Sequence, residues 1–360
     1  MKIGIYDPYL DDLGGGEKYM MTIAECLAKK HDVSVFWNNT QDLVTLKQRF
    51  SFDLSAVKIV PNIFMPQVSS LKKWYETSQY DAIIFLSDGS IPLVFSKKLF
   101  LHIQQPLEQS QVTSTMGKLK ASRVTRVFYN SQFTKNFNTK LLSAIPSTVI
   151  YPPVTNHWKQ TKKEQIILHV GRFRVKNVAY VTDYKKQSVM IDAFKQMVDN
   201  HMHHGWKFIL AVSIKATDKE QFVQLQQKAK GYPIEFLINK SNRKLWDTYN
   251  KAKIYWHASG FGEDLKQHPE YAEHFGISTV EAMGAGAVPV VINAGGQKEI
   301  VTDGENGFLW ETLADLQKKT ERLIKDRVLL HKLSENARLR AKDFSREKFC
   351  EEVSALIMNE

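Results

Sequence analysis

The chain has 360 residues, 43% hydrophobic and 24% charged, a composition typical of a globular protein of about two domains. It excludes disordered, collagen-like and coiled-coil proteins, and no apolar stretch reaches the ~18 residues of a membrane-spanning helix. The first ten residues lack the apolar core of a signal peptide and indicate a first strand. The two cysteines, Cys26 and Cys350, form no CxxC motif and no framework, so we expect a reduced, cytoplasmic setting.

The formal charge of +11 is unevenly spread along the chain. Residues 109–163 contain no Asp or Glu but nine Lys and Arg: Lys118, Lys120, Arg123, Arg126, Lys135, Lys140, Lys159, Lys162 and Lys163. Such a region suits an anionic partner, either a membrane surface, a phosphorylated substrate or nucleic acid, although a solvated basic surface has the same composition. No zinc-finger, RNP or helix-turn-helix pattern is present, so we expect no nucleic-acid partner.

In the first half of the chain, apolar runs alternate with helical patterns, as in βαβ units with a parallel sheet. The predicted helix 17–30 has Met20, Ile23, Ala24 and Leu27 on one face. The predicted strands are Lys2–Tyr6, Val33–Phe36, Val57–Val60, Ala82–Leu86, Lys98–Ile103, Arg126–Tyr129 and Thr148–Tyr151. Pro152 and Pro153 then interrupt the pattern and indicate a stiff linker.

A second alternating series follows the linker. Its predicted strands are Gln165–Val170, Lys207–Val212, Pro233–Ile238, Ile254–His257, Val288–Ile292 and Phe308–Trp310. Its predicted helices are Val189–Met197, Lys219–Lys230, Arg243–Lys251 and Thr279–Gly284, and the chain after Trp310 is mostly helical. We therefore expect an α/β protein with two Rossmann-like domains facing a central cleft, rather than one large twisted sheet. The expected boundaries are 1–150 for the N-terminal domain, 151–156 for the linker, 157–342 for the C-terminal domain and 343–360 for a helix that returns to the N-terminal domain.

The first strand leads into a glycine-rich loop, Gly14-Gly15-Gly16-Glu17, at a predicted helix N-terminus. Backbone N–H groups in such a loop can approach an anionic or polyhydroxylated ligand, although a structural turn has the same pattern. A nicotinamide reader needs G-x-G-x-x-G directly after the strand and an acidic residue closing the second strand. The spacing here is wrong, and the second strand ends Phe36-Trp37-Asn38-Asn39, which argues against an oxidoreductase.

The most specific pattern is a pair of glutamates, Glu273 and Glu281, eight positions apart across a Phe-Gly-Ile turn that opens a helix. The N–H groups from Gly276 to Thr279 can hold a phosphate or a sugar hydroxyl. A carboxylate has two acceptor oxygens and suits a vicinal diol. Two carboxylates beside one anion site therefore suit a ligand with a diol at each end of a diphosphate, which is the form of a nucleotide sugar.

A diphosphate also needs cations. Arg172 ends a predicted strand, and Lys185 and Lys186 precede the next helix. An arginine fork and a lysine point charge can together support a departing diphosphate. Arg174 and Lys176 compete for this role, and a solvated loop cation is the structural alternative for each.

These residues resemble those of the retaining GT-B glycosyltransferases of family 4. The resemblance is carried by Gly14–Glu17, Tyr151–Pro153, Gly171–Phe173, Lys185–Gln187 with Asp192–Phe194, Trp256–Gly260 and the segment 273–307, which holds an E-x7-E signature and the Asn293–Gly296 turn. It covers nearly the full length and is weakest over residues 41–100. Two departures are the long stretch between Arg172 and Lys185 and the insert Glu263–Ala272.

The resemblance implies a role for each matching position, and those roles are expectations here. Glu273 would contact the donor-sugar hydroxyls and Glu281 the ribose diol. Arg172 and Lys185, or Lys186 in place of Lys185, would hold the diphosphate with the backbone N–H groups of Phe275, Gly276 and Ile277. His102 would lie beside the donor sugar, or else be structural, and Gly15 and Gly16 would face the phosphates and the acceptor.

The implied activity is transfer of a hexosyl unit from a nucleoside-diphosphate sugar to an acceptor hydroxyl with retention. GDP-mannose is the favoured donor, and a UDP-sugar-dependent transferase, a nucleotide-sugar epimerase and a non-catalytic binding module are the alternatives. No metal and no cofactor besides the nucleotide sugar are expected. The acid-free region suggests an anionic acceptor at the inner membrane face, such as a lipid-linked or cell-surface glycan, and a surface helix near Met116–Val127 could dock there.

Overall fold

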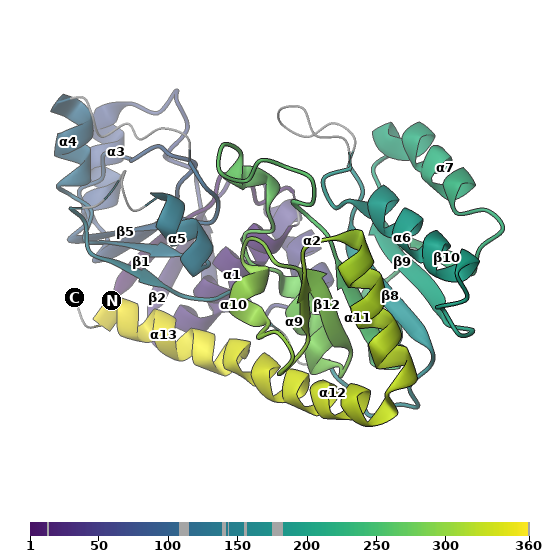
Figure 1. Cartoon of the computed structure of the whole chain (residues 1–360). Helices are drawn as coiled ribbons and strands as arrows, with labels where there is room; N and C mark the ends of the chain where they lie inside the picture. The colour runs from purple at the N-terminus through teal and green to yellow at the C-terminus, as the bar shows by residue number, and fades with distance from the viewer. Residues whose placement is uncertain are drawn as a thin grey trace. The chain divides into compact units, whose positions relative to one another are not determined.

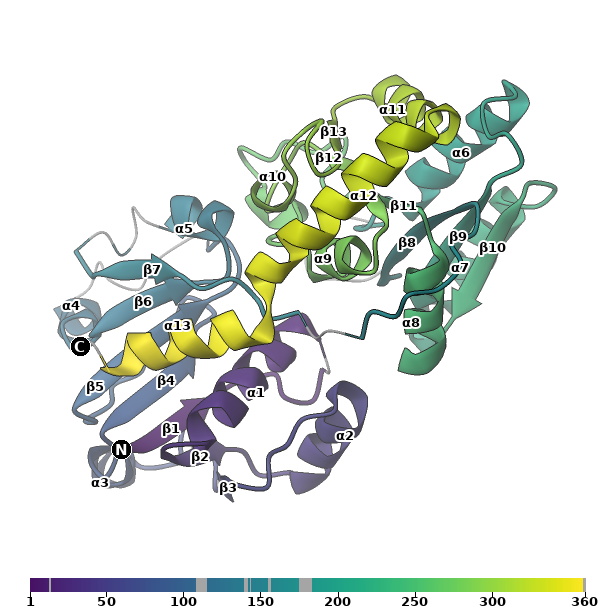
Figure 2. The ribbon, with the colours of Figure 1, turned by 90° about the horizontal axis from the view of Figure 1, so that it is seen from below.

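The computed structural model describes residues 1–12, 14–107, 115–138, 142, 144–154, 157–174 and 183–358. It consists of two compact units. The N-terminal unit comprises Met1–Pro153 and Arg346–Glu360, and the C-terminal unit comprises Val154–Ser345. In each unit, helices flank a sheet whose paired strands are all parallel (Figure 1). The last helix thus belongs to the same unit as the first strand (Figure 2).

The sheet of the N-terminal unit has seven described strands in the order β3-β2-β1-β4-β5-β6-β7. They are β1 (Lys2–Tyr6), β2 (Asp32–Phe36), β3 (Val57–Val60), β4 (Ala82–Leu86), β5 (Lys98–Ile103), β6 (Arg126–Tyr129) and β7 (Ser147–Val149). The helices are α1 (Gly15–Ala28), α2 (Thr40–Phe50), α3 (Ser70–Ser78), α4 (Thr115–Ala121), α5 (Gln132–Asn138) and α13 (Arg346–Met358). Every residue of β4 is buried, as expected for a central strand covered on both faces.

The sheet of the C-terminal unit has six described strands in the order β10-β9-β8-β11-β12-β13. They are β8 (Ile166–Arg172), β9 (Lys207–Ser213), β10 (Ile234–Ile238), β11 (Ile254–His257), β12 (Val288–Ile292) and β13 (Phe308–Trp310). The α-helices are α6 (Gln187–Asp199), α7 (Lys219–Lys228), α8 (Asn242–Lys251), α9 (Ile277–Gly284), α10 (Gln297–Ile300), α11 (Leu313–Lys325) and α12 (Arg327–Ala341). Short 3-10 turns are η2 (Ala216–Asp218), η3 (Pro269–Tyr271) and η4 (Lys342–Phe344).

The predicted strands agree with these elements to within two residues at their ends, whereas the helices α1, α6 and α9 begin two residues earlier than predicted. Side-chain capping explains the early starts of α1 and α6. The Glu17 carboxylate accepts a hydrogen bond from the Gly14 N–H, so α1 begins at Gly15. The Asp183 carboxylate accepts from the N–H groups of Gln187 and Ser188, each at 2.7 Å, so α6 begins at Gln187.

The predicted surface helix near Met116–Val127 is too long. The helix α4 ends at Ala121, because the chain must extend by Arg126 to enter β6 between β5 and β7. The short helices α2, α3, α5 and α10 were not anticipated. Among the described residues, no helix is long and apolar enough to cross a membrane.

The two cysteines correct another expectation, because they are paired. Cys26 on α1 and Cys350 on α13 form a disulfide with a Cα–Cα distance of 5.4 Å. The same helix pair is held by an ion pair between Arg346 and Glu25 and by Phe349, which lies edge-on to the ring of Tyr19. The cysteines are 324 positions apart in the sequence, so their spacing gave no sign of a pair that forms only when α13 returns to α1.

Candidate active site

In the C-terminal unit, the predicted site residues gather at the carboxyl ends of two neighbouring strands. Arg172 is the last residue of β8, and His257 is the last residue of β11, which pairs with β8. Lys185 lies in the segment before α6, and Glu273 in the loop between β11 and α9. In parallel sheets these ends share one edge, which is where loops bring ligand-binding side chains together.

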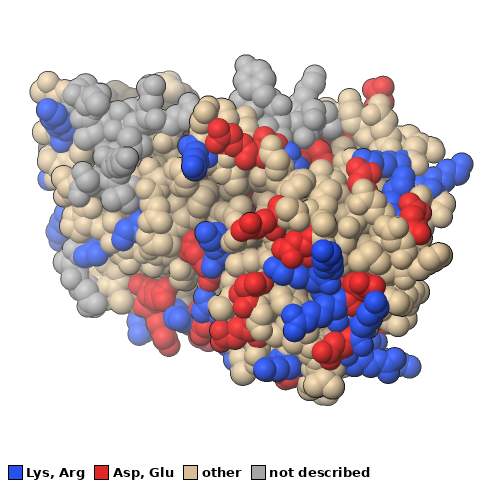
Figure 3. Space-filling view, viewed as in Figure 1, with Lys and Arg blue, Asp and Glu red and all other residues tan. Residues whose placement is uncertain are grey.

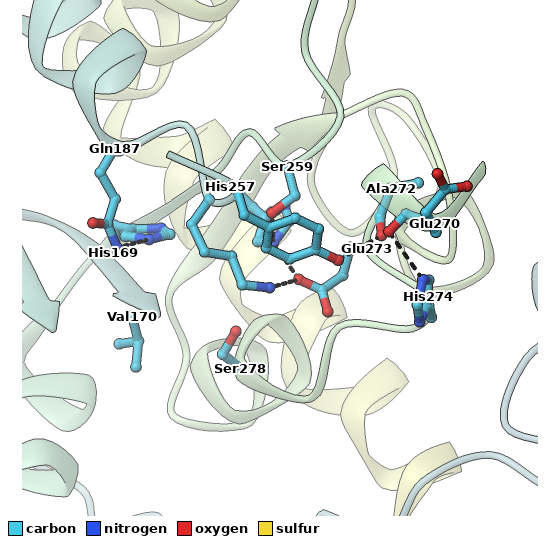
Figure 4. Close-up of polar contacts among 12 residues, drawn as sticks. His169, Val170, Gln187, His257, Ser259, Glu270, Ala272, Glu273, His274 and Ser278 are labelled. Carbon is cyan, nitrogen blue, oxygen red and sulfur yellow. Dashed lines mark hydrogen bonds and ion pairs between the residues drawn. The ribbon is translucent and has the colours of Figure 1, made fainter. Parts of the chain in front are cut away.

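Glu273 is the centre of this cluster (Figure 4). Its Oε2 atom lies 2.5 Å from Nζ of Lys185 and 2.7 Å from Nε2 of His257. Neither contact uses the other carboxylate oxygen, Oε1, and the Glu273 side chain keeps 19% of its surface exposed. One oxygen is thus occupied in holding the side chain, and the other remains to accept a hydrogen bond from a ligand hydroxyl.

Glu273 is charged and His257 is neutral. Burial alone would raise the pKa of Glu273, but Lys185 and His257 outweigh it and hold that pKa well below its usual range. Burial lowers the pKa of His257 despite the neighbouring carboxylate. The neutral ring therefore donates its Nε2–H to Glu273, which leaves the buried Nδ1 as an acceptor with no partner among the described residues.

A second buried histidine, His169 on β8, lies next to this cluster and was missed by the sequence analysis. Its Nδ1–H donates to the carbonyl of Trp256 at 3.0 Å, and burial lowers its pKa to about 3. A Cβ atom on Gly171 would stand 2.9 Å from His169 Nε2 and 3.3 Å from Cγ of Lys185. Glycine is thus favoured at this position of the Gly-Arg-Phe motif because the buried His169 ring, and less tightly the stem of Lys185, fill the space that a Cβ atom would need. The motif itself was the available signal for these contacts.

The two adjacent lysines, between which the sequence could not choose, have different partners in the structure. Lys185 contacts Glu273, and its Nζ lies 4.9 Å from the ring centre of Tyr184. Lys186 instead forms an ion pair with Glu263, the first residue of the insert. The insert also accepts a hydrogen bond at the Ala272 carbonyl from the Tyr184 hydroxyl, at 2.9 Å. Lys185 therefore belongs to the Glu273 cluster, and Lys186 helps to hold the insert.

The two candidate arginines, Arg172 and Arg174, also have different surroundings. Arg172 is exposed at the end of β8, close enough to Tyr184 to lower its pKa, although burial raises that pKa overall. Arg174 donates to the Ser213 carbonyl at 3.0 Å and lies 3.6 Å from the carboxylate of Asp218. Arg172 is thus beside the cluster, whereas Arg174 supports the end of β9. Lys176 lies outside the described residues, as do residues 155–156 of the expected linker.

The N-terminus of α9 forms the other side of the site. Gly276, which precedes the helix, has a φ of 123°, and a Cβ atom there would stand 2.5 Å from Nε2 of Gln297. The Phe275 ring is buried against Phe344, with ring centres 5.3 Å apart, so the backbone N–H is the part of Phe275 suited to a ligand. The N–H groups of Gly276 and Ile277 precede the first helical hydrogen bonds and are suited to an anion.

Buried polar groups without partners surround this helix start. Both polar atoms of the Gln297 amide and the Thr279 hydroxyl are buried and have no hydrogen-bond partner among the described residues. Such groups are rare in folded proteins, and here they are available to bind a polar ligand at the start of α9. The Gly296 N–H donates to the Glu273 carbonyl at 2.8 Å, so the predicted Asn293–Gly296 turn holds the backbone of Glu273.

Glu281 lies within α9, about one helical turn after this N-terminus. Its Oε2 accepts a hydrogen bond from the Tyr249 hydroxyl at 3.0 Å. Both Glu273 and Glu281 raise the pKa of the Tyr255 hydroxyl, which donates to Ser278 at 2.8 Å, although burial is the largest cause of that rise. Both carboxylates are thus close enough to the same buried tyrosine to influence its pKa, Glu273 from the loop before α9 and Glu281 from within the helix.

The remaining predicted residues belong to the N-terminal unit. Gly15 and Gly16 open α1 and are half-buried. A Cβ atom on Gly16 would stand 2.5 Å from the side-chain amide of Gln104, so this amide lies directly against the Gly16 backbone. Asp7, at the end of β1, is buried near Glu17, and its pKa is raised to about 8 by burial and by that carboxylate.

His102 is enclosed in the core of the N-terminal unit. Its ring stacks between Tyr19 and Phe128, at centroid distances of 4.2 and 4.7 Å, and has no exposed surface. Its Nδ1–H donates to the Phe128 carbonyl at 3.2 Å, and burial lowers its pKa to about 3. This geometry gives His102 a packing role, and its contact with a donor sugar stays a prediction.

Among the described residues, no three His, Cys, Asp or Glu side chains are grouped as a metal site would require. Independence from metals and from further cofactors stays a prediction, because it concerns the reaction rather than the residues.

Comparison with known proteins agrees with the fold. A crystal structure of the Anabaena protein HepE in complex with UDP superposes over 100% of both chains with a TM-score of 0.74 and 18% identity. An alpha-1,4-N-acetyl-D-galactosaminyltransferase of Campylobacter jejuni, named for a PP-undecaprenol substrate, is 24% identical over 96% of this chain and 95% of its own length. A GDP-Man:Man(3)GlcNAc(2)-PP-Dol alpha-1,2-mannosyltransferase of Dictyostelium discoideum is 25% identical over 56% of this chain. That alignment spans only 40% of the mannosyltransferase.

The family model described as "Glycosyl transferases group 1" matches residues 155–340, just over half of the chain. The matched segment contains Arg172, Lys185, Glu273 and Glu281, and the two parallel α/β units are those of the GT-B fold. The chain therefore belongs to the glycosyl transferases group 1 family.

Proposed function

We propose that the protein is a retaining, metal-independent glycosyltransferase of family 4 that moves a hexosyl unit from a nucleoside-diphosphate sugar to an acceptor hydroxyl. The arrangement around Glu273 is the observation that carries this proposal. One carboxylate oxygen is held by Lys185 and His257, and the other is left for a sugar hydroxyl. Lys185 has three N–H donors and uses one on Glu273, so it can also bind a phosphate oxygen.

Each part of the donor has a matching group in the C-terminal unit. The exposed Arg172, Lys185 and the N-terminus of α9 supply positive charge for the diphosphate, where negative charge develops as it departs. Glu281 accepts the ribose diol, with Tyr249 fixing its carboxylate. The Gln297 amide beside Gly276, which has no hydrogen-bond partner among the described residues, offers a further donor for the ligand.

The proposed step needs no protein nucleophile. The bond between the sugar C1 and the diphosphate oxygen breaks, and the acceptor oxygen bonds to C1 from the same face. The acceptor proton passes to an oxygen of the departing diphosphate, so charge and atoms balance. Lys185 and Arg172 stabilise that diphosphate, and Glu273 orients the sugar ring.

GDP-mannose is the donor we propose, supported by the alignment with a GDP-Man-dependent relative. A UDP-sugar is the second candidate. It is favoured by the relative that aligns over 95% of its length, which is named an N-acetyl-D-galactosaminyltransferase, and by the fold likeness to a UDP complex.

We further propose a lipid-linked or cell-surface glycan acceptor, which the protein meets at an anionic membrane surface. The names of both relatives contain a polyprenyl diphosphate, PP-Dol in one and PP-undecaprenol in the other. The excess of positive charge in residues 109–163 suits such an acceptor and the lipid surface that holds it.

A thermal-shift panel of nucleotides and nucleotide sugars, with Mg²⁺ and with chelator, tests the donor site. A ligand that binds only the folded state stabilises it by about 2.7 kcal/mol at a hundredfold excess over Kd. We expect a shift with one diphosphate sugar that chelator does not remove and that Glu281→Ala abolishes. If no nucleotide sugar shifts the melting temperature, the proposal fails. Donor conversion without an acceptor would instead indicate an epimerase, and donor binding without turnover a binding module.

A further inference from the structure

The helix α3 presents its apolar side chains to the outside. Leu71, Trp74 and Tyr75 are spaced i, i+3 and i+4, the pattern that normally marks the buried face of a helix. Their exposed fractions are 79%, 49% and 59%. Thr77 is the only buried residue of α3. The apolar side chains of α3 do not belong to the hydrophobic core clusters of the N-terminal unit, as far as the described residues show. In α2, by contrast, the equally spaced Leu43 and Leu46 are buried.

The next helix in the chain, α4, repeats this feature. Met116 and Leu119, spaced i and i+3, are 54% and 53% exposed, and Gly117 is the only buried residue of the helix. Lysines lie between and after them at positions 118 and 120. In the view of Figure 3, the charged side chains visible over α4 are basic.

Contacts with one loop join the two helices into a single surface. The Phe95 ring lies edge-on to Trp74, 6.4 Å between centroids, and the Phe95 N–H donates to Thr77 of α3 at 3.1 Å. Arg123, just after α4, donates to the carbonyl of Ser96 at 3.0 Å. Both views place α3 and α4 at the same end of the N-terminal unit (Figures 1 and 2).

The charge of this surface is strongly one-sided. Residues 70–78, 95–98 and 115–126 hold eight Lys and Arg and a single acid, Glu76. The exposed cations include Lys72, Lys118 and Arg123, and Lys97 is paired with Asp81. Exposed Leu, Trp, Tyr and Phe interleaved with cations match the boundary between lipid headgroups and acyl chains, where aromatic rings and lysine stems are both stabilised.

We propose that the α3–α4 surface, formed by Leu71, Trp74, Tyr75, Phe95, Met116 and Leu119 with the surrounding cations, docks onto an anionic phospholipid bilayer. The inference rests on the proposed lipid-linked acceptor, because a docked N-terminal unit meets an acceptor that cannot leave the bilayer. The helices have nine and seven residues, so they lie on the membrane rather than cross it. Positive charge draws the surface to anionic lipid, and the apolar side chains hold it there.

Co-sedimentation of the full chain with vesicles tests the inference. The anionic vesicles contain phosphatidylcholine with about 30% phosphatidylglycerol, which gives them a negative surface. We expect the chain to bind these vesicles and to bind vesicles of phosphatidylcholine alone more weakly. Leu71→Glu is expected to weaken binding at least about tenfold. The matched control is Val328→Glu on α12, because Val328 is 81% exposed and the substitution adds the same charge. Equal loss in both variants would overturn the inference.

The charge component is tested by a second pair of variants. Lys118→Gln/Lys120→Gln removes two cations of the surface, and each is expected to weaken binding to the anionic vesicles about fivefold. Lys318→Gln/Lys332→Gln makes the same charge change in the C-terminal unit and should have a smaller effect. Equal binding to neutral vesicles, or self-association that Leu71→Glu abolishes in sedimentation velocity, would contradict a lipid partner.

The donor thermal shift separates this inference from the proposed function. A Leu71→Glu variant that keeps the donor shift but loses the vesicles supports the docking surface. If the wild-type chain keeps the donor shift and ignores anionic vesicles, the docking inference fails and the proposed function stands. If the donor shift is absent, the proposed function fails whatever the vesicles show.

Discussion

Two histidines at the ends of parallel strands show how differently the two units use the same residue. His257 ends β11 in the C-terminal unit, and His102 lies one residue before the end of β5 in the N-terminal unit. Both rings are buried, and burial lowers the pKa of both. His257 donates to a charged carboxylate, whereas His102 is stacked between two aromatic rings and donates to a backbone carbonyl.

The difference shows that a neutral histidine can either position a charge or fill a core. Around His257, Lys185 and Glu273 bring opposite charges, so the ring becomes part of a charged network at the sheet edge. Around His102, the partners are apolar, so the ring contributes stacking and one hydrogen bond. Burial and a low pKa are therefore insufficient to identify a functional histidine, and the contacted group decides.

The largest effect is expected from removing the charge at the centre of the C-terminal cluster. Glu273→Gln keeps the size of the side chain but leaves Lys185 without its counter-ion, and it removes the charge that we propose accepts the sugar hydroxyl. We expect donor turnover to fall by about a hundredfold or more, measured as release of nucleoside diphosphate. Glu263→Gln, which removes the partner of Lys186, is the matched control and should retain most of the turnover.

The adjacent lysines provide the next test. Lys185→Ala removes a cation from the Glu273 cluster and is expected to lower kcat by about tenfold to a hundredfold, because the departing diphosphate loses stabilisation. Lys186→Ala disturbs only the pairing with the insert and should change kcat much less. The steady-state rates of the two variants decide the assignment, and a larger loss in Lys186→Ala would reverse it.

His257 is expected to position Glu273 rather than touch the donor. Its replacement by Phe removes a hydrogen bond to a charged group, which should lower kcat/KM by about tenfold. The pKa of Glu273 should rise without this donor, so the acid limb of the pH–rate profile should move to higher pH. His257→Gln, which restores an N–H donor, should recover activity and the pH profile. An unchanged acid limb in the Phe variant would contradict the positioning role.

The smallest effect on turnover is expected at His102. Because the folded pKa of about 3 is below the unfolded value, His102 contributes stability above about pH 6.5 that is lost as the pH falls toward 3. His102→Phe keeps the stack and removes this loss. Over that window, the fall in unfolding free energy should be shallower by up to about 1.4 kcal/mol per pH unit, as measured by urea unfolding. Loss of donor turnover in the His102→Phe variant would instead support the predicted contact between His102 and the donor sugar.

Much of the fold and of the site follows from local sequence. Strands buried on both faces require continuous apolar runs, so residues 82–86 and 288–292 identify themselves without reference to the rest of the chain. The spacing of Glu273 and Glu281 around a Phe-Gly turn places the first carboxylate in the loop before a helix and the second about one turn inside it, because that distance is set by local backbone geometry.

Contacts between distant segments were decided only in the tertiary structure. The sequence could not choose between Lys185 and Lys186, since the choice depends on which of Glu273 and Glu263 each side chain reaches across the sheet edge. Pairing of Cys26 with Cys350 depends on α13 returning to α1 over 324 positions. The apolar stripe of α3 has the pattern of a buried face. The core beside it is nevertheless filled by residues outside the helix, such as Ile63, Tyr80 and Val94, and the stripe is exposed. Periodicity records which side chains share a face, but the direction of that face depends on the rest of the fold.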